Sequence, residues 1–229
     1  MTATLKNSRK ADTMKAKPTR SDRRMVRNRK ALLGAAEKLI AEKGFERVTI
    51  DEIAETADLA KGTFYNYFDD KNQIATELAL TIRKDLNNEV GTAQAGIDDP
   101  AARLALGICV FLRTAVTAPT HAAVVAHMYG QWVRPEAAGN LRLRKDLEDG
   151  YRMKRFSVAR LDSAVVMTVG TVQAGIMRAL ELADSSAVRT LALELSGLVL
   201  RALGVKWNES QAIAAKAVAR VFDRKPQGT

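Results

Sequence analysis

Apolar residues recur along this chain at the three- and four-residue spacing of amphipathic helices. The first such run is predicted to begin between Ser21 and Asn28 and to end at Gly44, a residue type common just after helices. Phe45 follows the glycine and is expected to fold back on Ile40. The buried face of this helix is predicted to hold Leu32, Ala36, Leu39 and Ile40.

The stretch from Thr49 to Lys71 predicts two short helices joined by a turn. Thr49 and Glu52 have the spacing of a capping box, in which the two side chains satisfy backbone donors of the first helical turn. Val48 and Ile53 can close a hydrophobic staple at the same end. The inward face of this helix is predicted to hold Ile50, Ile53, Ala54 and Ala57.

The turn is expected at Asp58, because aspartate tolerates a left-handed backbone better than most non-glycine residues. A helix over residues 61–68 would be anchored by Phe64 and Phe68, which are four residues apart. The residues left to face outward or flank are Lys61, Gly62, Thr63, Tyr65, Asn66 and Tyr67. Exposed aromatic and amide groups beside a lysine indicate a surface that binds a partner. The alternative is that the two tyrosines only cover a small helical core.

The rest of the chain predicts further helices. Asp70 and Gln73 cap a long helix that reaches Val90, residues 91–97 form a loop, and Asp99 with Pro100 starts the next helix. Breakers at Pro119, Pro135 and Gly150 divide the following run into helices near 100–117, 120–132 and 136–153.

The C-terminal part of the chain carries two strongly apolar helices. The helix over 163–181 has apolar residues on every side, so it must be covered all round. The helix over 187–203 has an apolar seam at alternating spacings of three and four and ends at Gly204. These seams predict packing against a second copy of the chain or within an intramolecular core. A last helix is expected to be capped by Asn208.

Positive charge is concentrated at the N-terminus. Residues 1–30 hold eleven Lys and Arg against two Asp and Glu, a net charge of +9 out of the +10 of the whole 229-residue chain. Residues 1–20 contain almost no large apolar residue, which predicts a disordered basic arm with a polyanionic partner. The alternatives are a tail that is merely solvated and initiation at Met14.

Composition limits the other classes of protein. The single cysteine, Cys109, excludes an internal disulfide and a cysteine-based metal cluster, which suits a reducing cytoplasm. The N-terminus lacks the apolar core of a secretion signal, and polar or charged residues interrupt the longest apolar runs, as Arg178 ends the run 165–177. We therefore expect a soluble protein.

The segments AAEKLIAEKGF, TIDEIAETA and ADLAKGTFYNYFDDK resemble the TetR family of bacterial transcription regulators. The resemblance is specific over residues 29–78 and implies an all-α fold, in which a three-helix helix-turn-helix DNA-binding domain precedes a larger helical domain for ligand binding and dimerisation. The expected divisions are an arm over 1–20, a DNA-binding domain over 21–72 and an effector and dimerisation domain over 73–225.

The same resemblance implies roles for individual residues. Lys61, Gly62 and Thr63 would meet bases in the major groove, Tyr65, Asn66, Tyr67 and Lys71 would meet phosphates or bases, and Thr49 would add a phosphate contact. Two positions depart from the family pattern: Ala60 stands where a serine commonly caps the second helix, and Asp58 replaces a common glycine. The helices over 163–182 and 187–203 would form a four-helix dimer interface.

A homodimer would bind an imperfect palindrome through half-sites about 34–36 Å apart, or a multiple of that, and would most often act as a repressor. The basic arm is expected to enter the minor groove beside the site. Its predicted DNA contacts nearest the folded domain are Arg20, Arg23, Arg24 and Arg27.

The middle of the chain is expected to bind an apolar or amphipathic effector, coupled to DNA through the helix over 70–90. A filled core without a ligand is the alternative. The residues proposed to line the cavity are Phe111, His127, Met128, Trp132, Met167 and Gln173.

Catalysis is not expected, because phosphate-binding, nucleophile-elbow and zinc-protease motifs are missing from the sequence. His121 and His127 are six residues apart on one predicted helix, about 240° around its axis, so they cannot share a metal without other ligands. No cofactor is therefore expected. A DNA-binding architectural protein or constitutive regulator without an effector is the remaining alternative.

Overall fold

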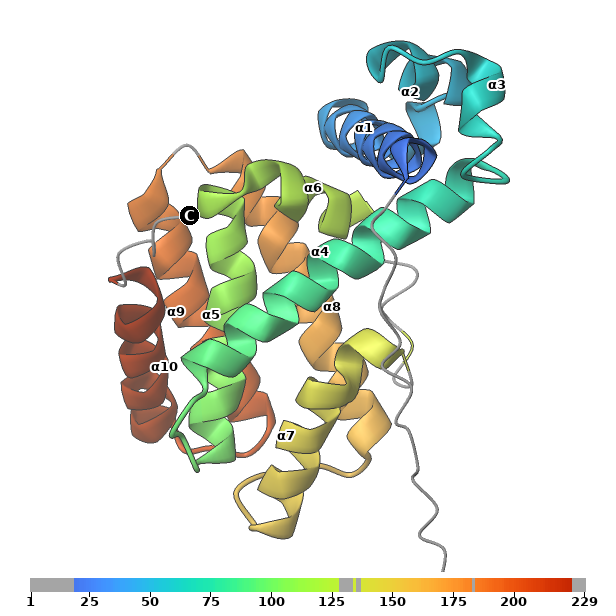
Figure 1. Ribbon diagram of the computed structural model, residues 1–229. Helices are drawn as coiled ribbons and strands as arrows, with labels where there is room; N and C mark the ends of the chain where they lie inside the picture. Colours follow the sequence, from blue (N-terminus) through green and yellow to red (C-terminus); the bar gives the residue numbers. More distant parts are fainter. Residues whose placement is uncertain (1–18, 128–133, 135–136, 183, 224–229) are drawn as a thin grey trace, which may run out of the picture.

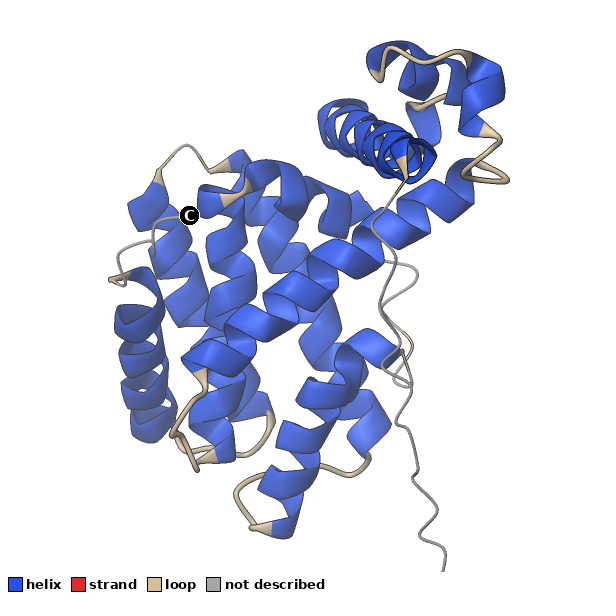
Figure 2. Ribbon diagram, in the orientation of Figure 1, coloured by secondary structure: helices blue, strands red, loops and turns tan. Residues whose placement is uncertain are grey.

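The computed structural model describes residues 19–127, 134, 137–182 and 184–223, and this part of the chain contains helices and no strand (Figure 2). The elements in chain order are α1 (Arg20–Lys43), η1 (Phe45–Arg47), α2 (Ile50–Thr56), α3 (Lys61–Phe64), α4 (Lys71–Ala93), α5 (Pro100–Thr117), α6 (Pro119–His127), η3 (Ala138–Asn140), α7 (Leu141–Arg152), α8 (Leu161–Glu181), α9 (Ser185–Ala202) and α10 (Trp207–Phe222). The expectation of an all-α protein is confirmed.

The helices form two groups that α4 connects (Figure 1). Helices α1, α2 and α3 make a small unit at one end, and the helices from α5 to α10 make a larger bundle into which α4 extends. Helix α4 buries a continuous face at Ile74, Leu78, Ile82, Leu86 and Val90. One rigid element therefore belongs to both groups.

Helix α1 begins earlier than the sequence pattern predicted. Thr19 caps it, and a capping box with Asp22 satisfies the backbone donors of the first turn, so the helix starts at Arg20. The helix ends as predicted at Gly44, whose φ of 79° lies in the region that favours glycine. Arg20, together with the arginines of the next two turns, is thus helical and does not belong to a flexible arm.

Helix α4 is also longer than predicted, because it continues through Gly91 to Ala93 where a loop was expected. Val90 and Ala93 are buried and extend the apolar face by one turn. A Cβ at Gly91 would lie 3.0 Å from Nη2 of Arg142, so the glycine allows the guanidinium group of α7 to pack closely on α4. The predicted caps at Asp70 and Asp99 are confirmed.

Helix α5 lies at the centre of the larger group and packs against α4 and every helix from α6 to α10. By length and composition alone α5 and α8 could cross a membrane, and burial in this bundle accounts for the apolar character of α5. Helix α8 was predicted to be covered all round, but Val166 and Met177 are 40% and 56% exposed on the single chain. One face of α8 is thus left open.

Two further predicted boundaries concern α6 and α10. The predicted extension of α6 to residue 132 falls outside the described residues. Helix α10 begins at Trp207 after Lys206, so Asn208 lies in its first turn and the predicted cap at Asn208 is wrong. The start is shifted because Val205 is buried just before the helix and Trp207 packs beneath the guanidinium group of Arg201, 4.9 Å from the ring centroid.

Candidate nucleic-acid interface and ligand cavity

The first helix of the predicted DNA-binding motif is fixed by its own end groups. The Thr49 side chain accepts a hydrogen bond from the Glu52 amide, and the Glu52 carboxylate accepts one from the Thr49 amide at 2.9 Å. The predicted capping box is therefore confirmed. The Lys43 ammonium group, followed by hydrogen bonds from the Thr49 hydroxyl and amide, lowers the pKa of Glu52 to about 2, so its carboxylate is charged at neutral pH.

Asp58 makes the turn between α2 and α3 with a φ of 54°, as the sequence predicted. The Leu59 amide then donates to the Ala54 carbonyl at 2.9 Å, which closes the end of α2. Helix α3 starts after Ala60, which offers no side-chain cap. Regular α-helix ends at Phe64, and turns continue to Tyr67. The predicted helix over 61–68 is thus shorter, while both of its phenylalanine anchors are buried.

The outward side of α3 presents most of the residues predicted to contact DNA. Thr49, Lys61, Gly62, Tyr65 and Asn66 are exposed, and Thr63 and Tyr67 are half-buried. The Lys61 ammonium group lies 2.8 Å from the exposed Asp51 carboxylate. A Cβ at Gly62 would meet no atom within 4 Å, so nothing within the chain requires a glycine there. This leaves a convex surface of cationic, aromatic and amide groups.

Lys71 is placed differently from the other predicted contacts. Its ammonium group donates to the carbonyl oxygens of Phe45 and Glu46 at 3.1 and 3.2 Å, and it lies 4.5 Å from the centroid of the Phe45 ring. These contacts attach the start of α4 to the connection between α1 and α2. Lys71 therefore helps to hold the unit formed by α1, α2 and α3, called the recognition unit below, against the start of α4, and its place in the sequence did not indicate these contacts.

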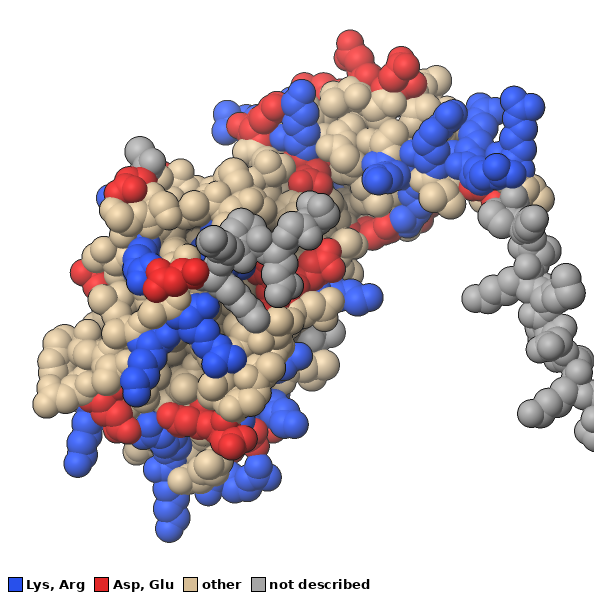
Figure 3. All heavy atoms as spheres, turned by 60° about the vertical axis from the view of Figure 1, so that its left-hand side comes forward, with Lys and Arg blue, Asp and Glu red and all other residues tan. Residues whose placement is uncertain are grey.

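Basic side chains gather around the N-terminal end of α1 (Figure 3). Arg20, Arg23, Arg24 and Arg27 occupy the first two turns of α1, and all four are exposed. Because these arginines belong to a helix, their backbone positions are fixed. Their side chains therefore have less conformational freedom than those of a flexible arm. The more distal lysines and arginines of the predicted arm lie outside the described residues.

A cavity of about 70 Å³ lies within the larger helical group. Helix α4 contributes Arg83, Asn87, Val90 and Gln94 through its cap, and α5, α6, α7 and α8 supply most of the remaining wall. The other lining residues are Arg103, Leu104, Gly107, Ile108, Phe111, Val125, Gly139, Arg142, Leu143, Asp146, Thr168, Val169, Val172, Gln173 and Ile176. The same helix that carries the recognition unit thus forms one wall of the cavity.

Two of the residues predicted to line a cavity, Phe111 and Gln173, lie in this wall. His127 is exposed and packs against Gly44 at the end of α1, and Met167 lies on the outer side of α8, so neither belongs to the cavity. Met128 and Trp132 lie outside the described residues. The assignment of His127 and Met167 to a ligand site stays a prediction, because apolar periodicity does not tell which face of a helix meets a cavity and which meets a neighbour.

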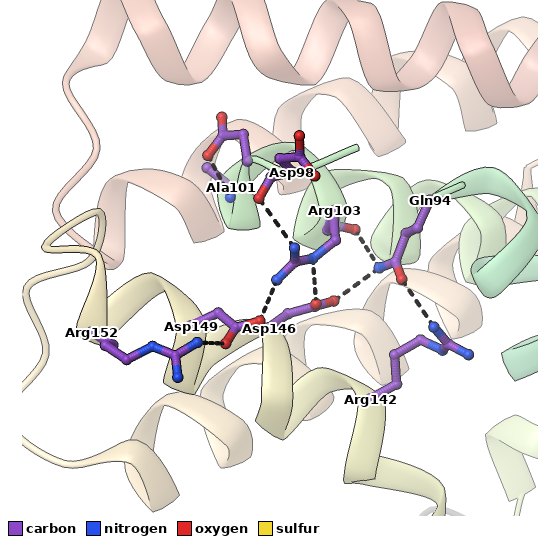
Figure 4. Close-up of polar contacts among 9 residues, drawn as sticks. Gln94, Asp98, Ala101, Arg103, Arg142, Asp146, Asp149 and Arg152 are labelled. Carbon is purple, nitrogen blue, oxygen red and sulfur yellow. Dashed lines mark hydrogen bonds and ion pairs between the residues drawn. The ribbon is translucent and has the colours of Figure 1, made fainter. Parts of the chain in front are cut away.

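A network of polar contacts joins four of the lining residues, Gln94, Arg103, Arg142 and Asp146 (Figure 4). The Asp146 carboxylate accepts from Arg103 Nε at 2.7 Å and from Gln94 Nε2 at 2.9 Å. Arg103 also donates to Asp149 at 2.7 Å, and Arg142 donates to Gln94 Oε1 at 3.4 Å. Burial raises the pKa of Asp146, and the Arg103 guanidinium group opposes that shift. The network joins α5 and α7 to the end of α4.

Two sets of contacts, one through α4 and one through α6, connect the cavity wall to the DNA-binding unit. On α4, Glu77 forms a two-pronged ion pair with Arg29 of α1, and Arg83 of the wall lies six residues, about 9 Å, further along the helix. In the second set of contacts, Gln173 of α8 donates to the Ala126 carbonyl of α6 at 2.6 Å. Helix α6 in turn contacts α1, where His121 Nε2 lies 3.1 Å from Glu37 Oε1.

An exposed helix-turn-helix, joined by one long helix to a larger helical domain, is the architecture of a helix-turn-helix transcriptional regulator. A family model described as bacterial regulatory proteins of the tetR family matches residues 32–78, and one described as tetracyclin repressor-like, C-terminal domain, matches residues 99–216. The second match covers more than half of the chain, which therefore belongs to the TetR family of transcription regulators. Regulators of this family bind DNA operators and small-molecule effectors and act as dimers.

Individual relatives agree with this assignment. The regulator BetI of Rhizobium meliloti is 30% identical over 54% of this chain and 64% of its own length. The regulator HbdR of Aromatoleum sp. is 32% identical over 47% of each chain. An uncharacterised regulator of Bacillus subtilis, YdeS, is 41% identical over 24% of this chain and 28% of its own. The chain thus spans less than two thirds of each of these relatives.

Solved structures show the same fold. The structure of RolR with its ligand resorcinol has a TM-score of 0.59 and 26% identity, covering 85% of this chain and 96% of RolR. A putative tetR family regulator from Shewanella sp. PV-4 has a TM-score of 0.69 at 17% identity, covering 78% of this chain and 99% of that chain, and supports the fold alone.

Proposed function

We propose that this protein is a cytoplasmic, dimeric repressor that leaves a palindromic operator when a small effector enters the cavity. The observation that carries the proposal is the outward surface of α3, where Lys61, Tyr65 and Asn66 are exposed although Phe64 between them is fully buried. Lys61 pairs with the exposed Asp51 and Tyr65 contacts the Phe64 ring at its edge, and both side chains keep an exposed part that is available for a duplex. Catalysis plays no part in this function.

The residues of α3 divide into two roles. Lys61 and Thr63, at the start of the helix, read bases, and Gly62 lets the backbone approach the duplex. Tyr65, Asn66, Tyr67 and Thr49 hold phosphates, the arginines of α1 add phosphate contacts outside the motif, and Lys71 orients the unit. Equal losses of affinity for operator and random DNA in every α3 variant, measured by fluorescence anisotropy, would reject base reading by this helix.

Dimerisation is assigned to α8 and α9. On the single chain, Val166 and Met177 of α8 are exposed, and Leu198 of α9 is 57% exposed. Helices α8 and α9 pack side by side. Covering these side chains with a second copy would remove their apolar surface from water. Met177→Glu with Leu198→Glu should yield a monomer by light scattering, while Leu80→Glu, at a 48% exposed leucine of α4, should leave the dimer intact.

Coupling between effector and DNA is assigned to α4. A ligand that binds more tightly to the dimer with wrongly spaced recognition helices weakens DNA binding, and the size of the effect is set by the ratio of its affinities for the two arrangements. DNA weakens ligand binding by the same factor. Arg29→Gln removes the ion pair that joins α1 to α4 and should reduce this coupling factor. Lys30→Gln, the neighbouring charge change on α1, is the matched control.

A constitutive regulator without an effector is the second candidate. The cavity favours the responsive regulator, because its wall includes α4 and because RolR, 26% identical to this chain, binds resorcinol. Thermal stabilisation of the dimer by small aromatic and aliphatic compounds, followed by operator release at the same concentrations, separates the two candidates. If no compound both stabilises the protein and releases the operator, the constitutive candidate is preferred.

A further inference from the structure

Gln173 places a buried amide in the cavity wall, and the chain uses only one half of it. The residue is 7% exposed, and its Nε2 donates to the Ala126 carbonyl at 2.6 Å. Because a carbonyl oxygen can only accept, this contact fixes the NH₂ group of the amide towards α6 and leaves Oε1 on the other side. Among the described residues, no donor is bonded to Gln173 Oε1. A buried acceptor is thus left for a molecule that enters the cavity.

Two other neutral side chains of the wall show the same arrangement. Asn87 of α4 donates through Nδ2 to the Gly139 carbonyl at 3.2 Å, and the Thr168 hydroxyl of α8 donates to the Ala164 carbonyl at 2.8 Å. Each of these side chains uses a donor on the backbone and keeps an oxygen that can accept a further hydrogen bond. The wall therefore offers acceptors from both α4 and α8.

The buried charged groups of the wall are engaged within the chain. The Asp146 carboxylate accepts from Arg103 at 2.7 Å and from Gln94 at 2.9 Å. Arg83 donates to a side-chain oxygen and a backbone carbonyl of η3. A cationic ligand would find the one carboxylate of the described lining already paired with Arg103, and a carboxylate ligand would bring an acceptor to the acceptor of Gln173. These contacts favour an uncharged ligand that donates a hydrogen bond.

The rest of the wall is largely apolar and surrounds a small space. Its apolar side chains include those of Leu104, Ile108 and Phe111 on α5 and of Val169 and Val172 on α8. The volume of about 70 Å³ is roughly half that of an engineered apolar cavity of about 150 Å³ that holds benzene. A ligand matched to this wall has a small apolar body.

We propose that the effector is a small uncharged alcohol or phenol, whose hydroxyl group donates to Gln173 Oε1 and whose apolar body packs against α5 and α8. This inference rests on the proposed effector function and narrows it to one chemical class. A hydroxyl group suits the site because a buried acceptor left without a donor costs free energy. Since the other end of the same amide holds Ala126 of α6, and α6 contacts α1, the bound hydroxyl acts on a side chain that is linked to the DNA-binding unit.

The test uses isomers that differ in whether they carry a donor. 4-Methylphenol and benzyl alcohol are compared with anisole, and 1-butanol is compared with methyl propyl ether, because the compounds of each set contain the same atoms and the ethers have no hydroxyl group. Each is titrated calorimetrically into the full-length protein beside benzoate, and operator release is followed by fluorescence anisotropy. In at least one set a hydroxyl compound should bind about tenfold more tightly than its ether, because the ether leaves the buried acceptor unpaired.

Two variants locate the partner of the hydroxyl group. Gln173→Met keeps an unbranched side chain and removes the acceptor, so the preference for the hydroxyl compound over its ether should fall close to one. Gln211→Met makes the same substitution on α10, outside the cavity wall, and should keep the preference. If Gln173 served only to join α8 to α6, its substitution would weaken the binding of both isomers equally and leave the preference unchanged.

The outcomes separate the inference from the function on which it rests. If the ethers bind as tightly as their isomers and release the operator, the inference is overturned while the effector function stands. A preference that persists in Gln173→Met, or tighter binding of benzoate than of every hydroxyl compound, also overturns the inference. If none of these compounds binds but another small molecule releases the operator, only the inference fails, and if no compound does either, both fail. The comparison of isomers in the unaltered protein needs no variant to fold.

Discussion

The recognition unit and the ligand cavity are built in opposite ways. Around α3, the groups that face a partner lie within a few residues of the buried anchors Phe64 and Phe68, so one short segment holds both core and surface. Around the cavity, Arg83, Phe111, Arg142 and Gln173 come from four helices that span ninety residues of sequence. The first site depends on local geometry and the second on how the helices pack.

This difference predicts that a change at the cavity leaves the DNA-binding fold intact. The cavity wall is held by long-range polar contacts, such as those of Arg103 with Asp146 and Asp149, whose rearrangement shifts whole helices. The recognition unit is held by a capping box, a tight turn and two buried rings, so it moves as one body when α4 moves. A regulator needs both properties.

The largest effect that separates the two regions is expected from truncating a phenylalanine in each. Phe64→Ala removes a fully buried ring and should destabilise the DNA-binding unit by ~3–5 kcal/mol. Phe111→Ala should cost clearly less, because its half-buried ring already faces the cavity. Urea unfolding followed by circular dichroism, with operator binding as a second readout, measures both changes. Equal costs would mean that the Phe111 wall is as tightly packed as the core.

The next effect tests whether the α3 surface acts on DNA and not on the fold. Lys61→Ala should weaken operator binding by ~1–3 kcal/mol, because the variant cannot make a hydrogen bond to a base edge. The unfolding free energy should change little, since Lys61 is exposed and its partner Asp51 is exposed as well. Lys38→Ala, an exposed charge change on α1, is the control. A decrease in stability as large as the decrease in affinity would contradict the assignment.

The same contrast decides how much could be predicted from sequence. The Thr49–Glu52 box, the left-handed Asp58 and the two ring anchors followed from residues close in sequence, and the structure confirms them. Helix α1 was placed too late because its capping box uses Asp22 in place of the usual glutamate or glutamine.

The cavity could be predicted only in part. Arg83 follows buried Ala79 and Ile82 on the inner face of α4, so a charged residue within that apolar register was the available signal. Its meaning depends on Asn140 and Phe111, which are 57 and 28 positions away in sequence and which no local pattern relates to it. Arg142 carried no signal, because an arginine on an exposed helix face is ordinary.

A smaller effect concerns the division of positive charge between the N-terminal segment and α1. Deleting residues 1–18 keeps the Thr19 cap and removes Lys6, Arg9, Lys10, Lys15 and Lys17. The slope of log affinity against log salt should flatten by ~0.9 for each DNA phosphate that these side chains neutralise. The operator preference should not change, because α3 is untouched. Arg23→Gln with Arg24→Gln, on the first turns of α1, is the comparison, and an unchanged slope after the deletion would show that the deleted lysines and arginine neutralise no phosphate.

The smallest expected effect is a pH dependence confined to the recognition unit. The pKa of Glu52 is lowered from 4.5 to about 2 in the folded protein, so its contribution to stability is present above about pH 4.5 and is lost as the pH falls towards 2. Glu52→Gln keeps the hydrogen bonds of a capping box but cannot titrate. The unaltered protein should therefore be more stable than this variant at pH 6, and the difference in unfolding midpoint should narrow as the pH is lowered. Glu55→Gln on the same helix controls for the change in net charge. A difference that stays constant between pH 6 and pH 3 would show that the hydrogen bonds of the Glu52 side chain, and not its charge, hold the start of α2.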